Sequence, residues 1–590
     1  MATQFETDCA ILAGRAYQLT RADINQFPVP NGWSEFFHVP NPAFPTTKGF
    51  EAVSFQRGNE IVIAYAGTAQ PVDWLANSGL AFGLGSDQLR QAALYYLEVK
   101  AANPGATISF TGHSLGGGLA ALMGVFFDEK AVTFDQAPFG NANTVAIRDD
   151  LIAYLNAHGY SNSELGVLAP ELLVYDPLAS DTNPSLDRLH NITSYFVQGE
   201  VLHGFPVSPP FYPLGFQSML SHGSTGAGSI DLHSQALLSA FLQNDDFRQI
   251  TFELPELLKM VFDSALYAYN TAASNTQFVN FLEHLVRHQI GNAPGVAAAD
   301  QMLDRFTEDL QKVAQDGGLT LTNEHITRTL VAFAMQKYYE EQPGGTDYGV
   351  TLFNDVTGGI RFDREAVADT LGQAKGYTRY FQDYLNSLPP AEQAIVTQLL
   401  PTMTDWFIQA GSQAMNATAD TKRAFMLGGV DSDNMTGGND ADLLMGNEGN
   451  DTLLGGAGDD GLLGGAGDDT LNGGAGYDRY VIEGHDTIQD SDGQGRIQDK
   501  AGNLISGTVL KRADGTYVFL ADSTISVAKD TNLTLTLADG TTLVIENFQN
   551  GALGLHLAEE SETQFQIGNT IAGDRAPLKD ANNNIQHDQW

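Results

Sequence analysis

The stretch Ala106-Thr107-Ile108-Ser109-Phe110-Thr111-Gly112-His113-Ser114-Leu115-Gly116 sets the class of the fold. Its apolar and β-branched start predicts a strand over 106–110, and the apolar residues after Ser114 predict a helix over 115–127. A Gly-x-Ser-x-Gly pentapeptide at a strand-to-helix turn exposes its serine oxygen above a sheet. We therefore predict that Ser114 is a nucleophile.

The segments on both sides of this turn alternate between strand and helix patterns. Buried strands are predicted over 60–66, 131–134 and 192–197, and an amphipathic helix over 87–100. Such alternation is typical of an α/β layer fold with a mostly parallel sheet. We predict that this domain spans residues 1–240.

The region 241–427 has a different character. Apolar residues recur at helical spacing, as in 258–269, which predicts core packing rather than chemistry. We interpret the region as a helical cap or a spacer, and its end, 411–427, as a linker. Residues 500–560 alternate like strands around Asp514-Gly515 and Asp539-Gly540, which are hairpin-turn signals. The polar end, 561–590, is expected to be a tail.

Between these regions lies a tandem repeat of nine residues, whose first unit begins at Gly428. The sixth position of every unit is Asp: Asp433, Asp442, Asp451, Asp460, Asp469 and Asp478. The eighth is apolar or aromatic: Met435, Leu444, Leu453, Leu462, Leu471 and Tyr480. Stacked turns would bring the carboxylates within a few ångströms of one another, which requires cations, and Ca²⁺ prefers carboxylate and carbonyl oxygens.

This pattern resembles the calcium-binding repeat of RTX exoproteins. The resemblance implies a parallel β-roll over 428–499, in which about four structural calcium ions would lie between repeats two apart. The expected ligands are the acids of the repeats: Asp431, Asp433, Asp440, Asp442, Asp451, Asp459, Asp460, Asp468, Asp469 and Asp478. It also implies export by a type I secretion apparatus, and hence an extracellular protein.

Composition agrees with export. The chain has 590 residues, a formal net charge of -41 and one cysteine, Cys9. The charge argues against nucleic acid as a partner, because phosphate binding needs clustered Lys and Arg. The first residues lack a basic and apolar signal-peptide pattern. The sequence contains no run of eighteen apolar residues, so no transmembrane segment is predicted.

The first domain resembles the class 3 lipases, which are α/β-hydrolases. The matching segments are 63–68, with Asp73-Trp74-Leu75 after it, the serine turn, and 132–141. The resemblance covers about residues 45–240. It implies that the backbone N–H groups of Thr68 and Leu115 form the oxyanion hole.

The resemblance also points to an acid shortly after the strand at 192–197. Glu200 occupies this position, where the family usually has Asp. Asp176, at the end of the strand-like 172–175, is the alternative acid.

The base is expected before a late helix, where His233 precedes Ala236–Leu242. His203 and His222 are its rivals. The order serine, acid, histidine is that of α/β-hydrolases.

These residues predict an ester hydrolase that forms an acyl-enzyme on Ser114. The expected substrate is a lipid ester at an oil or membrane interface, with triacylglycerol first and a phospholipid (phospholipase A1 activity) as the alternative. A non-enzymatic alternative is an RTX cytolysin or adhesive module that carries a relic hydrolase domain. The glycine-flanked segment 79–85 is a candidate lid, and the apolar segment 204–219 is a candidate wall for an acyl chain.

Overall fold

The computed structural model forms two compact units. The first comprises Met1–Gln315, Arg328–Tyr348 and Ala374–Tyr380, and the second Asp316–Thr327, Gly349–Gln373 and Phe381–Trp590. The structure describes residues 2–19, 21, 23–46, 49–67, 87–177, 188–203, 212–266, 280–316, 324–340, 360–363, 376–403, 405–408, 411, 414–418 and 422–560.

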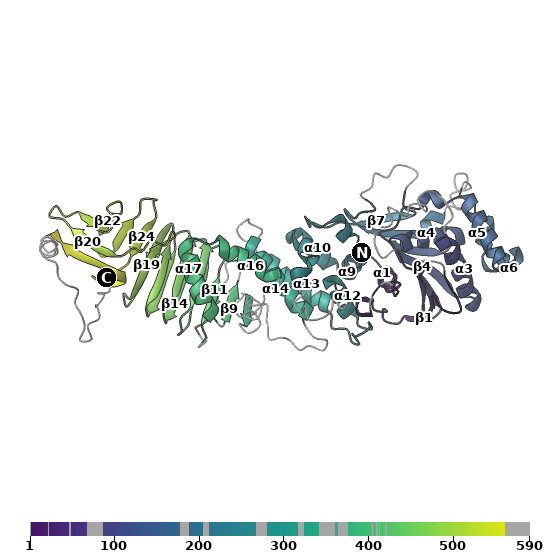
Figure 1. Ribbon diagram of the computed structural model, residues 1–590, viewed down its shortest axis with the longest axis horizontal. Coiled ribbons are helices and arrows are strands. Elements are labelled where there is room, and N and C mark those ends of the chain that lie inside the picture. The colour runs from purple at the N-terminus through teal and green to yellow at the C-terminus, as the bar shows by residue number, and fades with distance from the viewer. Residues whose placement is uncertain are drawn as a thin grey trace, which may run out of the picture. The chain divides into compact units, whose positions relative to one another are not determined.

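A seven-stranded sheet forms the centre of the first unit, and its strands lie in sequence order (Figure 1). They are β1 (Ser34–Val39), β2 (Ala52–Arg57), β3 (Glu60–Tyr65), β4 (Thr107–His113), β5 (Lys130–Phe134), β6 (Ile192–Val197) and β7 (Phe216–Leu220). The first three pair antiparallel, and β3 to β7 pair parallel. The carboxyl ends of the parallel strands therefore share one edge.

Helices cover both faces of this sheet. On one face α1 (Gln4–Arg15) packs on β4 and α9 (Gln235–Gln243), and the Thr111 hydroxyl donates to the Cys9 carbonyl, 3.2 Å away. On the other face α3 (Asp87–Ala102) and α4 (Leu115–Phe127) cover Tyr65 and Phe110. Every residue of α4 is buried, since the helix lies between the sheet and other helices.

Several further helices complete the first unit: α5 (Val145–Ala157), α6 (Asn162–Leu168), α7 (Pro170–Val174), α8 (Ser229–Leu232), α10 (Asp245–Glu253), α11 (Leu257–Val261), α12 (Phe281–Ile290) and all but the last residue of α13 (Met302–Asp316). Helix α14 (Glu324–Glu340) belongs to the first unit from Arg328 onward. Helix α12 packs against α9. The part of the middle region around α12 thus belongs to the first unit by its packing.

The predicted strand at 172–175 is wrong, because residues Pro170–Val174 form helix α7. Pro170 occupies the first turn, where its missing N–H and fixed φ favour a helix. Only Leu172 of this turn is buried. A short apolar run does not by itself distinguish a strand from a buried helical turn.

Two largely parallel sheets form the second unit. One contains β19-β17-β15-β13-β11-β9-β8 and the other begins β10-β12-β14-β16-β18-β24. Their strands are β8 (Ile360–Asp363), β9 (Asp405–Ile408), β10 (Ala414–Asn416), β11 (Ala424–Leu427), β12 (Asn434–Thr436), β13 (Leu443–Glu448), β14 (Thr452–Ala457), β15 (Gly461–Ala466), β16 (Thr470–Ala475), β17 (Asp478–Ile482), β18 (His485–Ile488), β19 (Gly495–Asp499) and β24 (Thr542–Ile545).

Between β11 and β17, paired residues are eighteen positions apart, as in Leu453 with Leu471. Two nine-residue repeats therefore make one turn, and consecutive repeats contribute strands to opposite sheets. The eighth-position side chains form one buried cluster between the sheets. Residues 411–427 are not simply a linker, because β10 and β11 extend both sheets ahead of the repeats. Phe425, Met426 and Leu427 of β11 are buried.

The strands after the repeats extend the second sheet with β20 (Gly507–Lys511), β21 (Tyr517–Phe519), β22 (Ser526–Lys529), β23 (Leu533–Thr536) and β25 (Leu555–Glu559). Hairpins join β20 to β21 and β23 to β24, at the two predicted Asp-Gly turns. Helices α16 (Gly376–Ser387) and α17 (Pro390–Leu399) precede the repeats, and α17 packs on β15.

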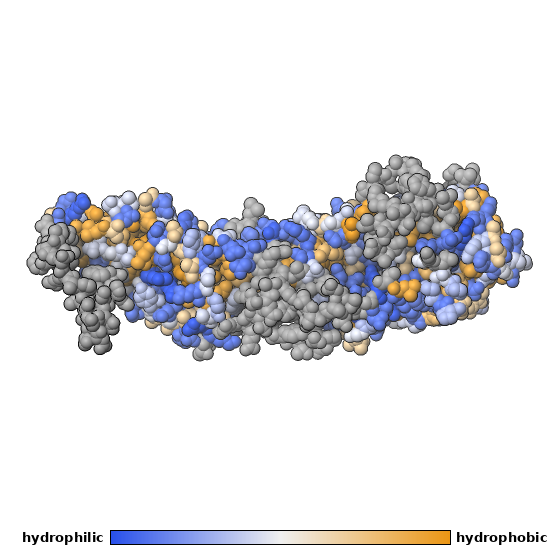
Figure 2. Space-filling view, viewed as in Figure 1, coloured by the Kyte–Doolittle hydropathy of each residue, from blue (hydrophilic) through white to orange (hydrophobic). Residues whose placement is uncertain are grey.

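The described surface is mainly hydrophilic. Figure 2 shows blue residues surrounding smaller orange areas on the face drawn there. Among the described residues, no helix combines the length and the apolar character that a membrane crossing requires.

Candidate active site

Ser114 lies in the sharp turn between β4 and α4. Its backbone has φ 58° and ψ -124°, a conformation that costs a non-glycine residue about 1–3 kcal/mol. Three hydrogen bonds hold it: the Ser114 N–H donates to Phe134 O (2.9 Å), and the N–H groups of Gly118 and Ala137 donate to Ser114 O (3.1 and 3.0 Å). The predicted nucleophile, Ser114, therefore has a strained backbone conformation that its neighbours hold in place.

Two glycines allow the chain to approach itself at this turn. A Cβ on Gly112 would lie 2.3 Å from the backbone of Gly116, and a Cβ on Gly116 would lie 2.0 Å from Tyr65 O. Gly67, at the end of the predicted oxyanion segment, would place a Cβ 3.3 Å from the Ser114 Cβ. The β3 end and the serine turn are therefore immediate neighbours.

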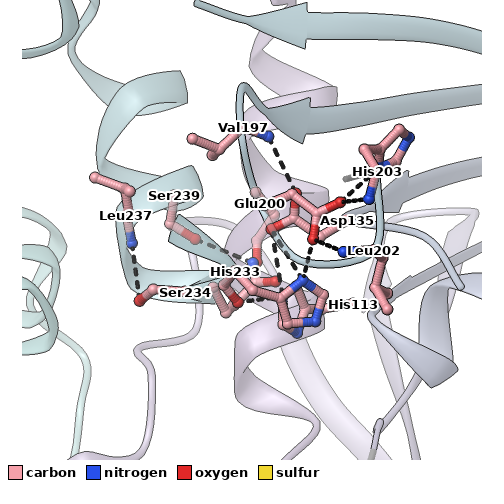
Figure 3. A network of polar contacts seen from close by, with 12 residues as sticks. His113, Asp135, Val197, Glu200, Leu202, His203, His233, Ser234, Leu237 and Ser239 are labelled. Carbon is pink, nitrogen blue, oxygen red and sulfur yellow. Dashed lines mark hydrogen bonds and ion pairs between the residues drawn. The ribbon is translucent and has the colours of Figure 1, made fainter. Parts of the chain in front are cut away.

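The structure brings His233 and Glu200 together, as Figure 3 shows. The Nδ1 atom of His233, which follows α8, lies 2.7 Å from Oε2 of Glu200, which follows β6. Both residues are buried, with exposed fractions of 3% and 0%. A carboxylate only accepts, so His233 Nδ1 carries the proton and a neutral His233 has a lone pair at Nε2. That Nε2 has no hydrogen-bond partner among the described residues.

His113 joins this pair to the serine turn. Its Nε2 lies 3.1 Å from the backbone carbonyl oxygen of His233, and the two rings have centroids 4.7 Å apart. Since a carbonyl accepts, His113 carries its proton on Nε2, and its Nδ1 accepts from the Tyr17 hydroxyl at 3.1 Å. Burial, followed by the proximity of His233, holds the pKa of His113 well below its usual value, so its ring is neutral.

Glu200 is ionised because it is surrounded by donors. Burial raises its pKa, but hydrogen bonds from His203, His233 and the Leu202 N–H outweigh that effect and bring the pKa of Glu200 from 4.5 to about 2. The Leu202 N–H donates to Oε2 (2.7 Å), and the His203 N–H and Nδ1 donate to Oε1 (both 2.5 Å). The site therefore holds a fixed negative charge behind His233.

The rival residues make other contacts. His203 binds the other oxygen of Glu200 and stacks on Phe196, with ring centroids 3.8 Å apart. His222 is directed to the Gln198 carbonyl oxygen, 2.9 Å away. Asp176 is exposed. Of these candidates, His233 is the one in contact with His113, the neighbour of Ser114.

The sequence reasoning did not single out Asp135 or Tyr17. Asp135 directly follows β5, the strand beside β4, and its Oδ2 lies 4.0 Å from His233 Nδ1. An acid placed immediately after a strand next to the nucleophile strand was the available signal, because parallel strands bring their carboxyl ends together. Tyr17 had no comparable signal, since it lies far from the site in sequence.

Of the predicted oxyanion donors, Leu115 is buried at the first position of α4. Thr68 lies outside the described residues, as do the candidate lid 79–85 and residues 204–211 of the candidate acyl-chain wall. The described part of that wall includes Leu214, which is buried, and Phe216 and Met219, which are exposed.

In the repeats the sixth-position aspartates form a buried ladder. The N–H groups of the first four, Asp433, Asp442, Asp451 and Asp460, each donate to Oδ1 of the aspartate two repeats later, as from Asp442 to Asp460 at 2.7 Å. The ladder continues to Asp486, which accepts from Asp469 at 3.2 Å. The sequence analysis missed Asp486 because it follows Asp478 by eight residues and not nine, which breaks the period.

A second observation, which does not depend on the sequence repeat, indicates that this aspartate ladder is suited to binding calcium. The Oδ2 atoms of four of these aspartates are buried and have no hydrogen-bond partner among the described residues: Asp451, Asp460, Asp469 and Asp478. Burial raises the pKa of Asp460 to about 8, which a bound cation would reverse. The other predicted ligands, Asp431, Asp440, Asp459 and Asp468, are exposed.

Comparison with known proteins agrees with both halves of this description. A family model described as a Tle-like phospholipase domain matches residues 39–206, and the RTX calcium-binding nonapeptide repeat matches residues 427–462 and 445–480. The chain joins a phospholipase-like domain to RTX calcium-binding repeats. The predicted combination of a lipase-type domain with these repeats is thereby confirmed. RTX repeats are typical of secreted proteins, in agreement with the predicted extracellular location.

Individual relatives match this chain to different extents. Extracellular phospholipase A1 of Serratia liquefaciens is 40% identical over 89 residues, which is 15% of this chain and 28% of that protein. Among solved structures, a lipase from Rhizopus microsporus var. chinensis aligns with 37% of this chain and 75% of its own (14% identity, TM-score 0.23). The extracellular lipase LipA of Serratia marcescens aligns with 94% of this chain and with 71% of its own chain (13% identity, TM-score 0.21).

Proposed function

We propose that this chain is a secreted serine hydrolase that cleaves acyl esters of glycerolipids, with Ser114, His233 and Glu200 as its triad. The observation that carries the proposal is the strained Ser114 turn beside the buried His233–Glu200 pair. A strained turn that presents a serine, next to an oriented imidazole, is the arrangement that acyl transfer requires.

In the proposed mechanism, Ser114 Oγ attacks the ester carbonyl while His233 Nε2 accepts the hydroxyl proton. Glu200 holds Nδ1–H and stabilises the imidazolium that forms. The Leu115 N–H, with that of Thr68, stabilises the oxyanion. His233 then protonates the leaving alcohol, and water cleaves the acyl-enzyme through the same base. Because His113 is neutral, no second positive charge opposes the imidazolium.

Phospholipid is the substrate that we place first, because the matched domain family and the Serratia liquefaciens relative are both described as phospholipases. Triacylglycerol, which the sequence analysis placed first, presents the same acyl ester with a different third substituent. Both substrates therefore belong in the first assay, presented as vesicles and as an emulsion.

We propose that the RTX repeats form a β-roll that binds several structural calcium ions through the buried aspartates. The orphaned Oδ2 atoms support this assignment. Calcium at about 10⁻⁴–10⁻³ M, as extracellular modules require, would fold the roll outside the cell. Export by a type I apparatus belongs to the same proposal.

The test is Ser114→Ala, with Ser109→Ala on the same strand as the matched control. Hydrolysis of a p-nitrophenyl ester, phosphatidylcholine vesicles and a triacylglycerol emulsion is measured in millimolar calcium. The Ser114→Ala variant should lose at least about a thousandfold in kcat, whereas the control should stay close to the native chain. Full activity of Ser114→Ala would contradict Ser114 as the nucleophile, whereas no ester hydrolysis by the native chain would favour the non-enzymatic alternative.

A further inference from the structure

A second carboxyl group faces the proposed catalytic histidine. Asp135 is fully buried, and its backbone is fixed at φ 41° by a hydrogen bond from its N–H to Tyr195 O (2.8 Å). Its Oδ1 accepts from the Val197 N–H at 3.1 Å. The mechanism above assigns Asp135 no role.

The other oxygen of Asp135 points at the two histidines. Oδ2 lies 3.6 Å from His113 Nε2 and 4.0 Å from His233 Nδ1, and it has no hydrogen-bond partner among the described residues (Figure 3). Leaving a buried carboxyl oxygen without a partner is costly, so such a group calls for an explanation.

The two carboxyl groups around His233 differ in charge. Glu200 accepts hydrogen bonds from four groups, whereas Asp135 accepts one. Burial, and then the negative charge of Glu200, raise the pKa of Asp135 well above its usual value, whereas the donors around Glu200 lower the pKa of Glu200 to about 2. Glu200 therefore ionises more readily than Asp135.

The remaining titratable groups near Asp135 come from separate elements. His113 ends β4, with the Tyr17 hydroxyl on its Nδ1 and the Arg21 guanidinium 5.1 Å from the Tyr17 ring centroid. His203 lies behind Glu200. Arg21 is the cation of this group and lies beyond Tyr17, so the charge that chiefly controls the ionisation of Asp135 is that of Glu200.

We infer that Asp135 is a second positioning residue for His233, because it can accept the hydrogen bond from His233 Nδ1–H when Glu200 is removed. The inference rests on the proposed function. Without Glu200 the repulsion disappears and Asp135 ionises more readily. Its Oδ2 must then move by about 1 Å to reach hydrogen-bond distance from Nδ1. No bond to the substrate is involved.

The experiment is a double-mutant cycle with Glu200→Ala, Asp135→Asn and the double variant, assayed on a p-nitrophenyl ester from pH 5 to 9. Removing the function of the acid in a serine triad costs about 10⁴-fold in kcat. Glu200→Ala should lose less, about 10²–10³-fold, and should regain activity as the pH rises and Asp135 ionises. The double variant should be at least tenfold slower than Glu200→Ala, without that rise.

Controls separate the possible outcomes. Asp176→Asn, which changes an exposed acid, should not couple to Glu200→Ala, and Ser114→Ala defines the background. Circular dichroism checks that each variant is folded. If the Glu200→Ala variants unfold, the cycle is repeated with Glu200→Gln in their place. Equal activity of Glu200→Ala and the double variant at every pH would overturn the inference while leaving the hydrolase proposal intact. Native activity that survives in Ser114→Ala would instead contradict the proposed function.

Discussion

Replacing Leu453 by Ala tests the packing of the repeats. Leu453 is 0% exposed, in the cluster between the two sheets. The substitution removes three carbon atoms, worth about 0.8 kcal/mol each in transfer free energy, and leaves a cavity. Together these terms predict a loss of about 3 kcal/mol, within the range measured for buried Leu→Ala substitutions. For a unit of about 200 residues, this loss corresponds to a melting temperature lower by roughly 6–12 °C.

The next residue supplies the matched control. Leu454 lies on the same strand and points to the opposite face, where it is partly exposed. Leu454→Ala should therefore cost less than about 1 kcal/mol. Both variants are unfolded by heat as full chains in saturating calcium, with far-UV circular dichroism and calorimetry as readouts.

The comparison of the two variants can refute the packing argument. An equal loss in both would mean that the side chains do not alternate between an inner and an outer face. A larger loss in Leu454→Ala would mean that the register of the strand is displaced by one residue. Either result would contradict the eighteen-residue pairing on which the calcium assignment depends.

Three further predictions concern the two sites. Gly116→Ala should abolish ester hydrolysis and labelling of Ser114 by a fluorophosphonate, because its Cβ would lie 2.0 Å from Tyr65 O; normal labelling would contradict the elbow geometry. Because the pKa of Glu200 is lowered from 4.5 to about 2, its ionisation stabilises the fold above pH 4.5, and this stabilisation is lost as the pH falls toward 2. Glu200→Gln should therefore cost about 3 kcal/mol in urea unfolding at pH 7, and an undiminished cost at pH 2 would refute the linkage. Asp460→Asn, which changes a buried aspartate, should raise the calcium concentration at the midpoint of folding about tenfold, and Asp459→Asn, which changes an exposed one, should raise it less. Equal shifts would contradict the proposed difference between buried and exposed aspartates.

Much of the serine turn could be anticipated from local sequence. The predicted helix over 115–127 coincides with α4. Strand, glycine-flanked serine and apolar helix follow one another within about twenty residues, so local preferences and the turn chemistry agree. The repeats were equally readable, because a fixed period places the same residue type at the same position of each turn.

Contacts between distant segments were harder to anticipate. The choice of Glu200 over Asp176 as the acid, and of His233 over the other histidines as the base, relied on a family resemblance. Residues 172–175 were assigned the wrong element. Asp135 is separated from Glu200 by more than sixty residues, and its one local signal is its position directly after the strand at 130–134. Asp486 escaped the repeat count because one residue is missing from its unit.

Local sequence was enough to predict the elbow at Ser114, the aspartates of the repeats and an acidic chain suited to calcium. These are local or periodic properties, set by side-chain type and spacing along the backbone. The tertiary structure alone decided which acids face His233 and which of them is charged. Burial and the number of nearby donors control that charge, and both arise only when β4, β5 and β6 bring their ends together.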